Sequence, residues 1–336
     1  MSNLYKEYKW SELIKNEIRR YGHNIGENSY LAKLLEIANK NEKRNPKVYV
    51  IDRSLLREII KCVLTGEYKI QNQQTSLEYC INKYAPGLSE DIKRIVKEIS
   101  EYGIPLEEFF LNNPSARKLL LPPAKTFYLL DSSILHKISI KGTDLLDSII
   151  DLYTQNIPTA ESYYSSPAIV VVRDGPFNIF NPLLATLIHE YIHLTELHNY
   201  IWGNIEGKKN INLYDIIDKY IRPSNSLYKG YENKEFAKHE IITELGTIYI
   251  LEDVDMKDLS LDRMYFIKSK LDEIGEIKEK VGIGKIPRER MILSYLTAHY
   301  MHELADKNEN MKKILKDINE AINEELRLYV ERELKK

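Results

Sequence analysis

Apolar residues recur at helical spacing over much of the chain. Four such segments lie in the first 115 residues, at 11–22, 29–43, 53–64 and 90–103. The pairs Asn113-Pro114 and Pro122-Pro123 then interrupt the pattern, as expected at a boundary. We therefore expect a helical N-terminal region over residues 1–115, with a regulatory or partner-binding role, and a second region over residues 116–336.

The pattern changes after this boundary. β-Branched and aromatic runs at 125–140 and 167–175 are bounded by Pro or Gly and predict strands. Helical spacing then returns almost to the C-terminus, at 181–198, 211–221, 234–252 and in three further segments. The last of these is strongly amphipathic, which favours a helix packed on the protein over one that binds a membrane. The predicted fold class is α+β and predominantly helical, with a small mixed sheet.

Composition narrows the possible partners. The 48 basic and 50 acidic residues leave a formal net charge of −2, so we expect neither nucleic acid nor a membrane surface as a partner. No run approaches the roughly 18 apolar residues of a membrane span. The N-terminus is too charged for a secretory signal, so a cytoplasmic protein is expected. Many Lys, Glu and Ile residues with few Gln are also typical of thermophilic proteins.

The two cysteines, Cys62 and Cys80, are not spaced as a metal knuckle and are too few for a disulfide framework. We expect both thiols to be reduced and partly buried, as free cysteines usually are.

The stretch NPLLATLIHEYIHLTELHNY contains polar residues inside an apolar helical pattern. Asn181 and Pro182 suit a helix start, with Asn as the N-cap and Pro at the first helical position. The pattern continues without a helix breaker through His198. We therefore expect one continuous helix that is buried on both sides of its polar face.

His189 and His193 are one turn apart on this helix, so their imidazoles project side by side. Two ring nitrogens in that arrangement can bind one tetrahedral Zn²⁺. Glu190, directly after the first histidine, can reach a water at the open metal position without being a ligand. This is the HExxH arrangement, in which the glutamate is the general base.

The motif resembles that of the zincin metallopeptidases, in which this helix lies beneath the substrate cleft; the resemblance covers about residues 165–250. Metzincins extend the motif to HExxHxxGxxH. Here Glu196 and Asn199 occupy the glycine and last histidine positions, and His198 is one residue out of register. Gluzincins instead take a glutamate from a later helix, commonly within Glu-x-x-Ser/Ala-Asp.

The sequence Glu-Ile-Ile-Thr-Glu that starts at Glu240 is similar to the gluzincin pattern, in a predicted helix that begins after Asn233. The resemblance implies Glu240 as the third zinc ligand. Glu240 and Glu244 are one turn apart, and two carboxylates facing an apolar core repel each other unless a cation lies between them. Glu244 would then accept a hydrogen bond from a liganding histidine. Glu244 as the ligand, and Glu196 as the ligand, are the alternatives; a solvated acidic face is another.

Two further parts of a peptidase site can be expected. The strand at 167–175 resembles the zincin edge strand, which binds an extended peptide through its backbone; an ordinary core strand is the alternative. Hydrolysis also needs a donor for the oxyanion. Tyr295, His299 and His302 fall on one helical face. His299 is the preferred stabiliser, with Tyr295 or His302 behind it and a structural role as the alternative.

The sequence therefore predicts a zinc-dependent metallopeptidase of the gluzincin type that acts on a peptide or protein substrate. One alternative is a non-enzymatic regulatory or structural protein that retains the zinc site. Another is a helical di-iron carboxylate protein, because Glu190 and His193 also form a Glu-x-x-His pair. Such proteins need that pair twice, and the sequence offers no second copy.

Overall fold

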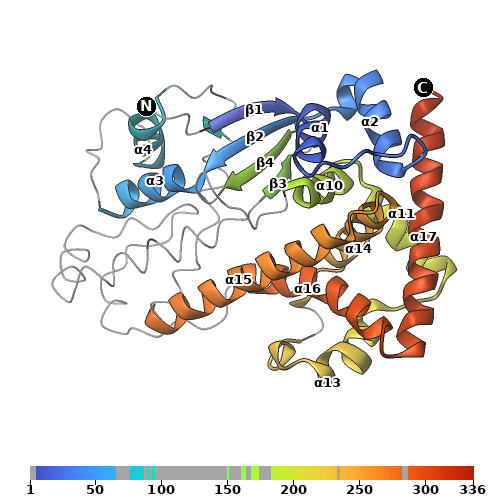
Figure 1. Ribbon diagram of the computed structural model, residues 1–336. Helices are drawn as coiled ribbons and strands as arrows, with labels where there is room; N and C mark the ends of the chain where they lie inside the picture. Colours follow the sequence, from blue (N-terminus) through green and yellow to red (C-terminus); the bar gives the residue numbers. More distant parts are fainter. Residues whose placement is uncertain are drawn as a thin grey trace.

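The fold is built around a four-stranded sheet with helices packed below and beside it (Figure 1). The computed structural model describes residues 5–65, 76–86, 90, 93–94, 150, 160–163, 168–173, 183–232, 235–281 and 287–336. Its strands are β1 (Tyr5–Lys9), β2 (Lys47–Asp52), β3 (Ala160–Tyr163) and β4 (Ala168–Arg173), in the order β1-β2-β4-β3. β2 and β4 are parallel, whereas the two outer pairs are antiparallel. The predicted α+β class, predominantly helical with a small mixed sheet, is confirmed.

The N-terminal part contains strands as well as helices. Its helical elements are α1 (Trp10–Arg20), α2 (Tyr30–Lys40), the 3-10 turn η1 (Glu42–Arg44), α3 (Arg53–Thr65) and α4 (Ser76–Tyr84). Three of the predicted helices are thus confirmed. The expectation of helices alone is wrong, because β1 and β2 also lie here, and β2 buries the β-branched Val48 and Ile51. Most of the predicted helix at 90–103, and the boundary near residue 115, lie outside the described residues.

Strand β4 confirms the strand predicted at 167–175 but not its place in the sheet. Within the described sheet it pairs with β2 on one side and with β3 on the other, so the edge-strand prediction is wrong. Residues 168–172 are all buried, as expected for a strand covered on both faces. Because β2 precedes the expected boundary and β4 follows it, both parts of the chain share one sheet. The other predicted strand, at 125–140, lies outside the described residues.

Helices make up the described part of the chain after β4. They are α10 (Leu183–Leu194), α11 (Leu197–Gly203), the π-helical turn η2 (Asn204–Lys208), α12 (Leu213–Ile216), the π-helical turn η3 (Ile217–Ile221), α13 (Arg222–Ser224), the 3-10 turn η4 (Ser226–Tyr228), α14 (Lys238–Asp253), α15 (Lys257–Val281), α16 (Pro287–Ala305) and α17 (Glu309–Leu334). The amphipathic α17 packs against α16 and α11, which confirms it as a packed surface helix.

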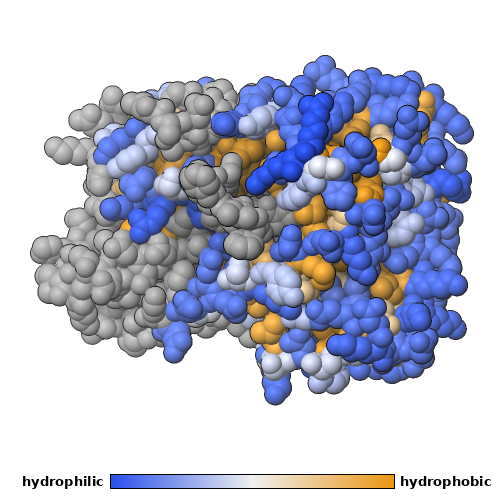
Figure 2. All heavy atoms as spheres, in the orientation of Figure 1, coloured by the Kyte–Doolittle hydropathy of each residue, from blue (hydrophilic) through white to orange (hydrophobic). Residues whose placement is uncertain are grey.

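Hydrophilic residues cover most of the described surface on the face drawn in Figure 2, and hydrophobic residues show in patches around the middle of the view. No helix among the described residues is long and apolar enough to cross a membrane.

Helix α10 is shorter than the sequence predicted, since it ends at Leu194 and the chain restarts as α11 at Leu197. The hydroxyl of Thr195 donates to the carbonyl oxygens of Tyr191 and Ile192, at 2.8 and 3.2 Å. Such bonds satisfy carbonyls that a continuing helix would use. Glu196 then adopts the left-handed conformation, with φ 58°, and turns the chain. The prediction of one helix through His198 is therefore wrong.

Helix α14 begins later than expected, at Lys238 rather than directly after Asn233, which lies outside the described residues. The backbone N–H of Ala237, its N-cap residue, donates to the hydroxyl of Ser294 in α16 at 3.0 Å. α14 also lies close to α10, because a Cβ on Gly246 would come within 3.2 Å of Cδ1 of Ile192. The late start places Glu240 in the first turn of α14, where the helix dipole favours a negative charge.

Residues of the N-terminal part contact α10 on the side opposite α14, through hydrogen bonds and ring stacking. The indole N–H of Trp10 donates to the carbonyl oxygen of Leu187 at 3.0 Å. The Trp10 ring stacks on Tyr191, with ring centroids 4.0 Å apart. The hydroxyl of Tyr191 donates in turn to the carbonyl oxygen of Arg44 at 3.1 Å. α10 is thus fixed by residues from the first 44 positions of the chain.

Cys62 and Cys80 form a disulfide that joins α3 to α4, with their Cα atoms 5.9 Å apart. The expectation of two reduced thiols is therefore wrong. Both residues are fully buried rather than partly buried, one in α3 and one in α4, and these two helices pack against each other. Spacing alone does not show this pairing, because it depends on how α3 and α4 pack.

Candidate metal centre

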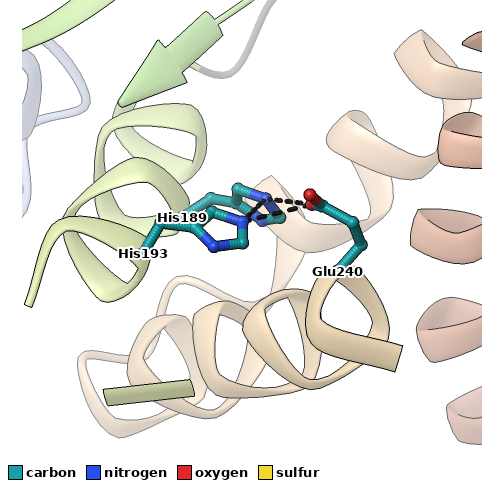
Figure 3. A group of neighbouring side chains, drawn as sticks. All are labelled: His189, His193 and Glu240. Carbon is teal, nitrogen blue, oxygen red and sulfur yellow. Dashed lines mark hydrogen bonds and ion pairs between the residues drawn. The ribbon is translucent and has the colours of Figure 1, made fainter. Parts of the chain in front are cut away.

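Three side-chain atoms from α10 and α14 converge on one point (Figure 3). Nε2 of His189 lies 3.2 Å from Nε2 of His193, and Oε2 of Glu240 lies 3.2 and 3.1 Å from these two nitrogens. Ligand atoms about 2.0–2.1 Å from a tetrahedral zinc ion are separated by about 3.3 Å. The triangle therefore has the dimensions that a small tetrahedral ion requires. All three residues are buried, and the cluster could hold a metal ion.

The second contact of each histidine fixes which nitrogen faces the triangle. Nδ1 of His189 lies 2.8 Å from Oε2 of Glu244, an ionised acceptor, so the proton is on Nδ1. The Thr243 hydroxyl donates to the carbonyl oxygen of His239 at 2.7 Å, which leaves its oxygen to accept from Nδ1 of His193 in a long contact of 3.5 Å. In the form of each histidine that can bind a metal, Nε2 carries a lone pair. Three such atoms at 3.1–3.2 Å repel one another unless a proton or a metal ion lies between them.

Glu244 is the second carboxylate of the centre, in the role expected for it from the sequence. It is fully buried, and its oxygens accept from Nε and Nη2 of Arg263 on α15 at 2.6 and 2.9 Å. Nη1 of Arg263 donates to the Thr186 hydroxyl at 2.8 Å. Burial raises the pKa of Glu244, but the charge of Arg263 and hydrogen bonds from His189 and His299 hold it well below its usual range. Glu244 therefore stays ionised.

Glu240 is ionised for related reasons. Burial is the largest single influence and raises its pKa, but the charge of His193 and hydrogen bonds from three histidines hold it well below its usual range. Arg263 neutralises Glu244, whereas the ion pairs of Glu240 within the described residues are with histidines. The negative charge of Glu240 is therefore balanced only by a proton on a histidine or by a bound cation. This charge favours a cation in the space between Glu240 and the histidines.

The pKa of His189 also shows that the centre favours a positive charge. Burial alone would lower this pKa, but hydrogen bonds to Glu240 and Glu244 outweigh it and raise the pKa to about 9. A proton on His189 is thus the charge that the centre holds when no metal is bound. Protons and metal ions compete for such a nitrogen.

The other predicted site residues lie outside the ligand group found among the described residues. Nε2 of His299 lies 2.9 Å from Oε1 of Glu244, so His299 meets the second carboxylate and not the ligand triangle. His302 lies further away, with Nδ1 3.9 Å from Oε1 of Glu252. The ring of Tyr295 is partly exposed and lies 5.2 Å from the ring of His189. Glu190 is buried on α10, with 6% of its surface exposed.

The rejected and alternative ligands can also be located. Glu196 is exposed at the turn after α10 and is not part of the cluster. His198 follows that turn, and its ring lies 5.0 Å from the ring of His193. The metzincin-type extension therefore brings a histidine near the site without making it a ligand.

Sequence reasoning missed two contributors to the centre. Arg263 carries no local signal, because it stands in an ordinary helical segment and its role depends on the packing of α15 against α10 and α14. His239, whose side chain is 47% exposed, lies with Nε2 3.1 Å from Oε1 of Glu240. Its place directly before a predicted ligand could have drawn attention to it.

No protein family, curated protein or solved structure matches the chain.

Proposed function

We propose that this protein is a zinc-dependent metallopeptidase in which His189, His193 and Glu240 hold the ion. The observation that carries the proposal is the triangle of three lone-pair donors at 3.1–3.2 Å. Two imidazole nitrogens and a carboxylate oxygen suit zinc. Catalytic zinc sites have three protein ligands and an open position, whereas structural sites have four. Among the described residues three ligand atoms converge, which supports an enzyme over a structural zinc protein.

The residues around the ion divide the chemistry between them. When bound, zinc would polarise the scissile carbonyl and lower the pKa of a water. Glu190, next to His189 on α10, takes the proton of the attacking water and passes it to the leaving amine. Arg263 and His299 hold Glu244, which in turn holds Nδ1 of His189 and so orients its ring.

Tyr295 is the better candidate to stabilise the oxyanion. His299 has its Nε2 engaged by buried Glu244, whereas the Tyr295 ring lies against His189 and is partly exposed. An extended peptide would pair with β3 rather than with β4, because β3 is an outer strand of the described sheet and lies against α10.

The di-iron alternative is less well supported. Such centres use carboxylates from four helices, but a single carboxylate lies in the described ligand group.

Glu190→Gln tests the proposal. The purified wild-type protein should bind about one zinc ion per chain, cleave peptides, lose activity to a chelator and regain it with zinc. Glu190→Gln should keep the metal and lose at least about 10²–10⁴-fold in peptide hydrolysis, because the variant has no base. Glu196→Gln, which changes an exposed glutamate just beyond the same helix, is the matched control and should keep full activity. Undiminished hydrolysis by Glu190→Gln would overturn the mechanism.

A further inference from the structure

The two oxygens of Glu240 have separate partners. Oε2 faces Nε2 of His189 and Nε2 of His193, as described above. Oε1 faces Nε2 of His239, at 3.1 Å. His239 precedes Glu240 in the first turn of α14, and its side chain is 47% exposed. A half-exposed histidine thus holds the oxygen of Glu240 that points away from the ligand triangle.

This contact bears on how the carboxylate can bind a metal. A carboxylate can offer one oxygen or both to the same ion. A hydrogen bond donated to Oε1 satisfies that oxygen and fixes the plane of the carboxylate, so Oε2 alone is presented to the triangle. Without the donor, Oε1 can rotate toward the ion and occupy the position that the reaction needs open.

We propose that His239 is a positioning residue that keeps Glu240 a one-oxygen ligand of the metal ion. The inference rests on the proposed metal centre but not on peptide cleavage. It makes the Nε2–H of His239 the donor in this contact, since the ionised Glu240 can only accept. His239 acts through Glu240 and needs no contact with the ion or with a substrate.

The neighbouring histidine does not offer the same contact. The His198 ring lies 5.0 Å from the His193 ring and 6.3 Å from the His239 ring. Nδ1 of His198 is directed at the carbonyl oxygen of Ile192, at 3.5 Å. Of the four histidines that gather here, His239 alone pairs with Oε1 of Glu240 among the contacts in the described residues.

The experiment compares His239→Phe, which removes the donor, with His239→Gln, whose amide N–H can replace Nε2. Affinity for zinc is measured by competition with a chelator, and the visible absorption of the Co²⁺-loaded protein reports the coordination number. His239→Phe should bind zinc about 10–100-fold more weakly. Its Co²⁺ bands should lose intensity as a fifth ligand atom joins the ion. His239→Gln should resemble the wild type in both measurements.

Equal affinities and equal Co²⁺ spectra for the three proteins would overturn the inference, as would a wild type that binds no metal. Since 47% of the side chain is exposed, His239→Phe should fold; the same readouts on His239→Ala guard against an effect of the phenyl ring. A wild type that binds metal but cleaves no peptide would refute the proposed enzyme and leave the role of His239 standing on the binding data.

Discussion

The side of α10 that faces α14 and the side that faces α1 are both buried, but different residues build them. Toward α14 the helix presents His189 and His193 to two carboxylates and, through Glu244, to Arg263. Toward α1 it presents Tyr191, which stacks on Trp10. One side is a network of charges, and the other is aromatic packing.

The two sides of α10 therefore contribute differently: the α1 side to the stability of the fold, and the α14 side to the proposed metal binding. Aromatic packing is stabilising whatever is bound nearby. Buried charges are costly unless each has a partner, so the side facing α14 depends on protons, on Arg263 and, in the proposed centre, on the metal ion. Changes on the α14 side should therefore alter metal binding and its pH dependence, whereas changes on the α1 side should alter the free energy of unfolding alone.

The largest effect is expected from Arg263→Met. This change leaves Glu244 fully buried without its guanidinium, and removing one partner of a buried ion pair costs about 3–5 kcal/mol. Chemical denaturation of the metal-free protein measures the loss. Arg327→Met is the matched control, because Arg327 pairs with Glu331 on the surface and such pairs contribute about 0–1 kcal/mol. Equal losses for the two variants would contradict the description of the α14 side as a charge network.

A smaller effect is expected of pH on the affinity for zinc. In the proposed centre zinc would need the unprotonated Nε2 of His189. Burial lowers the pKa of His189, but hydrogen bonds to the two carboxylates outweigh it and raise the pKa to about 9. Below that pH a proton must leave before the ion binds, so affinity should fall by about tenfold per pH unit, or about 1.4 kcal/mol. Competition with a chelator between pH 7 and 10 would show a slope that levels off above the pKa. An affinity independent of pH over this range would show that His189 holds no proton in the metal-free centre.

The smallest effect is expected on the α1 side, from Trp10→Phe. Phenylalanine keeps an aromatic ring against Tyr191 but cannot donate to the carbonyl oxygen of Leu187, which costs about 1 kcal/mol. Denaturation of the metal-free variant measures this loss, and zinc affinity should stay at the wild-type value. A weaker zinc affinity in Trp10→Phe would mean that the two sides of α10 are coupled.

The candidate ligands could be found from the sequence because their signals are local. His189 and His193 are one turn apart, and Glu240 and Glu244 repeat that spacing on a second helix. The structure brings His189, His193 and Glu240 together and places Glu244 on Nδ1 of His189. Arg263 could not be found in the same way, because a buried arginine is recognised only when the carboxylate it pairs with is known to be near.

The fold was less predictable for a similar reason. The helical pattern identified α1, α2 and α3, but β1 and β2 are short, and each becomes a strand by pairing with a distant partner. The position of β4 inside the sheet depends on β2, which the helical interpretation of the N-terminal part left out. The disulfide and the end of α10 likewise depend on packing and on side-chain hydrogen bonds to the backbone.

The parallel pairing of β2 with β4 also has a consequence for how the chain is made. Residues 47–52 leave the ribosome long before residues 168–173, whereas β1 is already present to cover the other side of β2. Closing so long a loop is slow, because distant pairings must first overcome the entropy of the intervening chain. Until β4 arrives, β2 exposes unpaired backbone groups along one edge, and such an edge can pair with another nascent chain. Slower synthesis or a chaperone that shields β2 should therefore matter more for the yield of this protein than the assembly of the candidate metal centre. The proposed ligands His193 and Glu240 are only 47 residues apart.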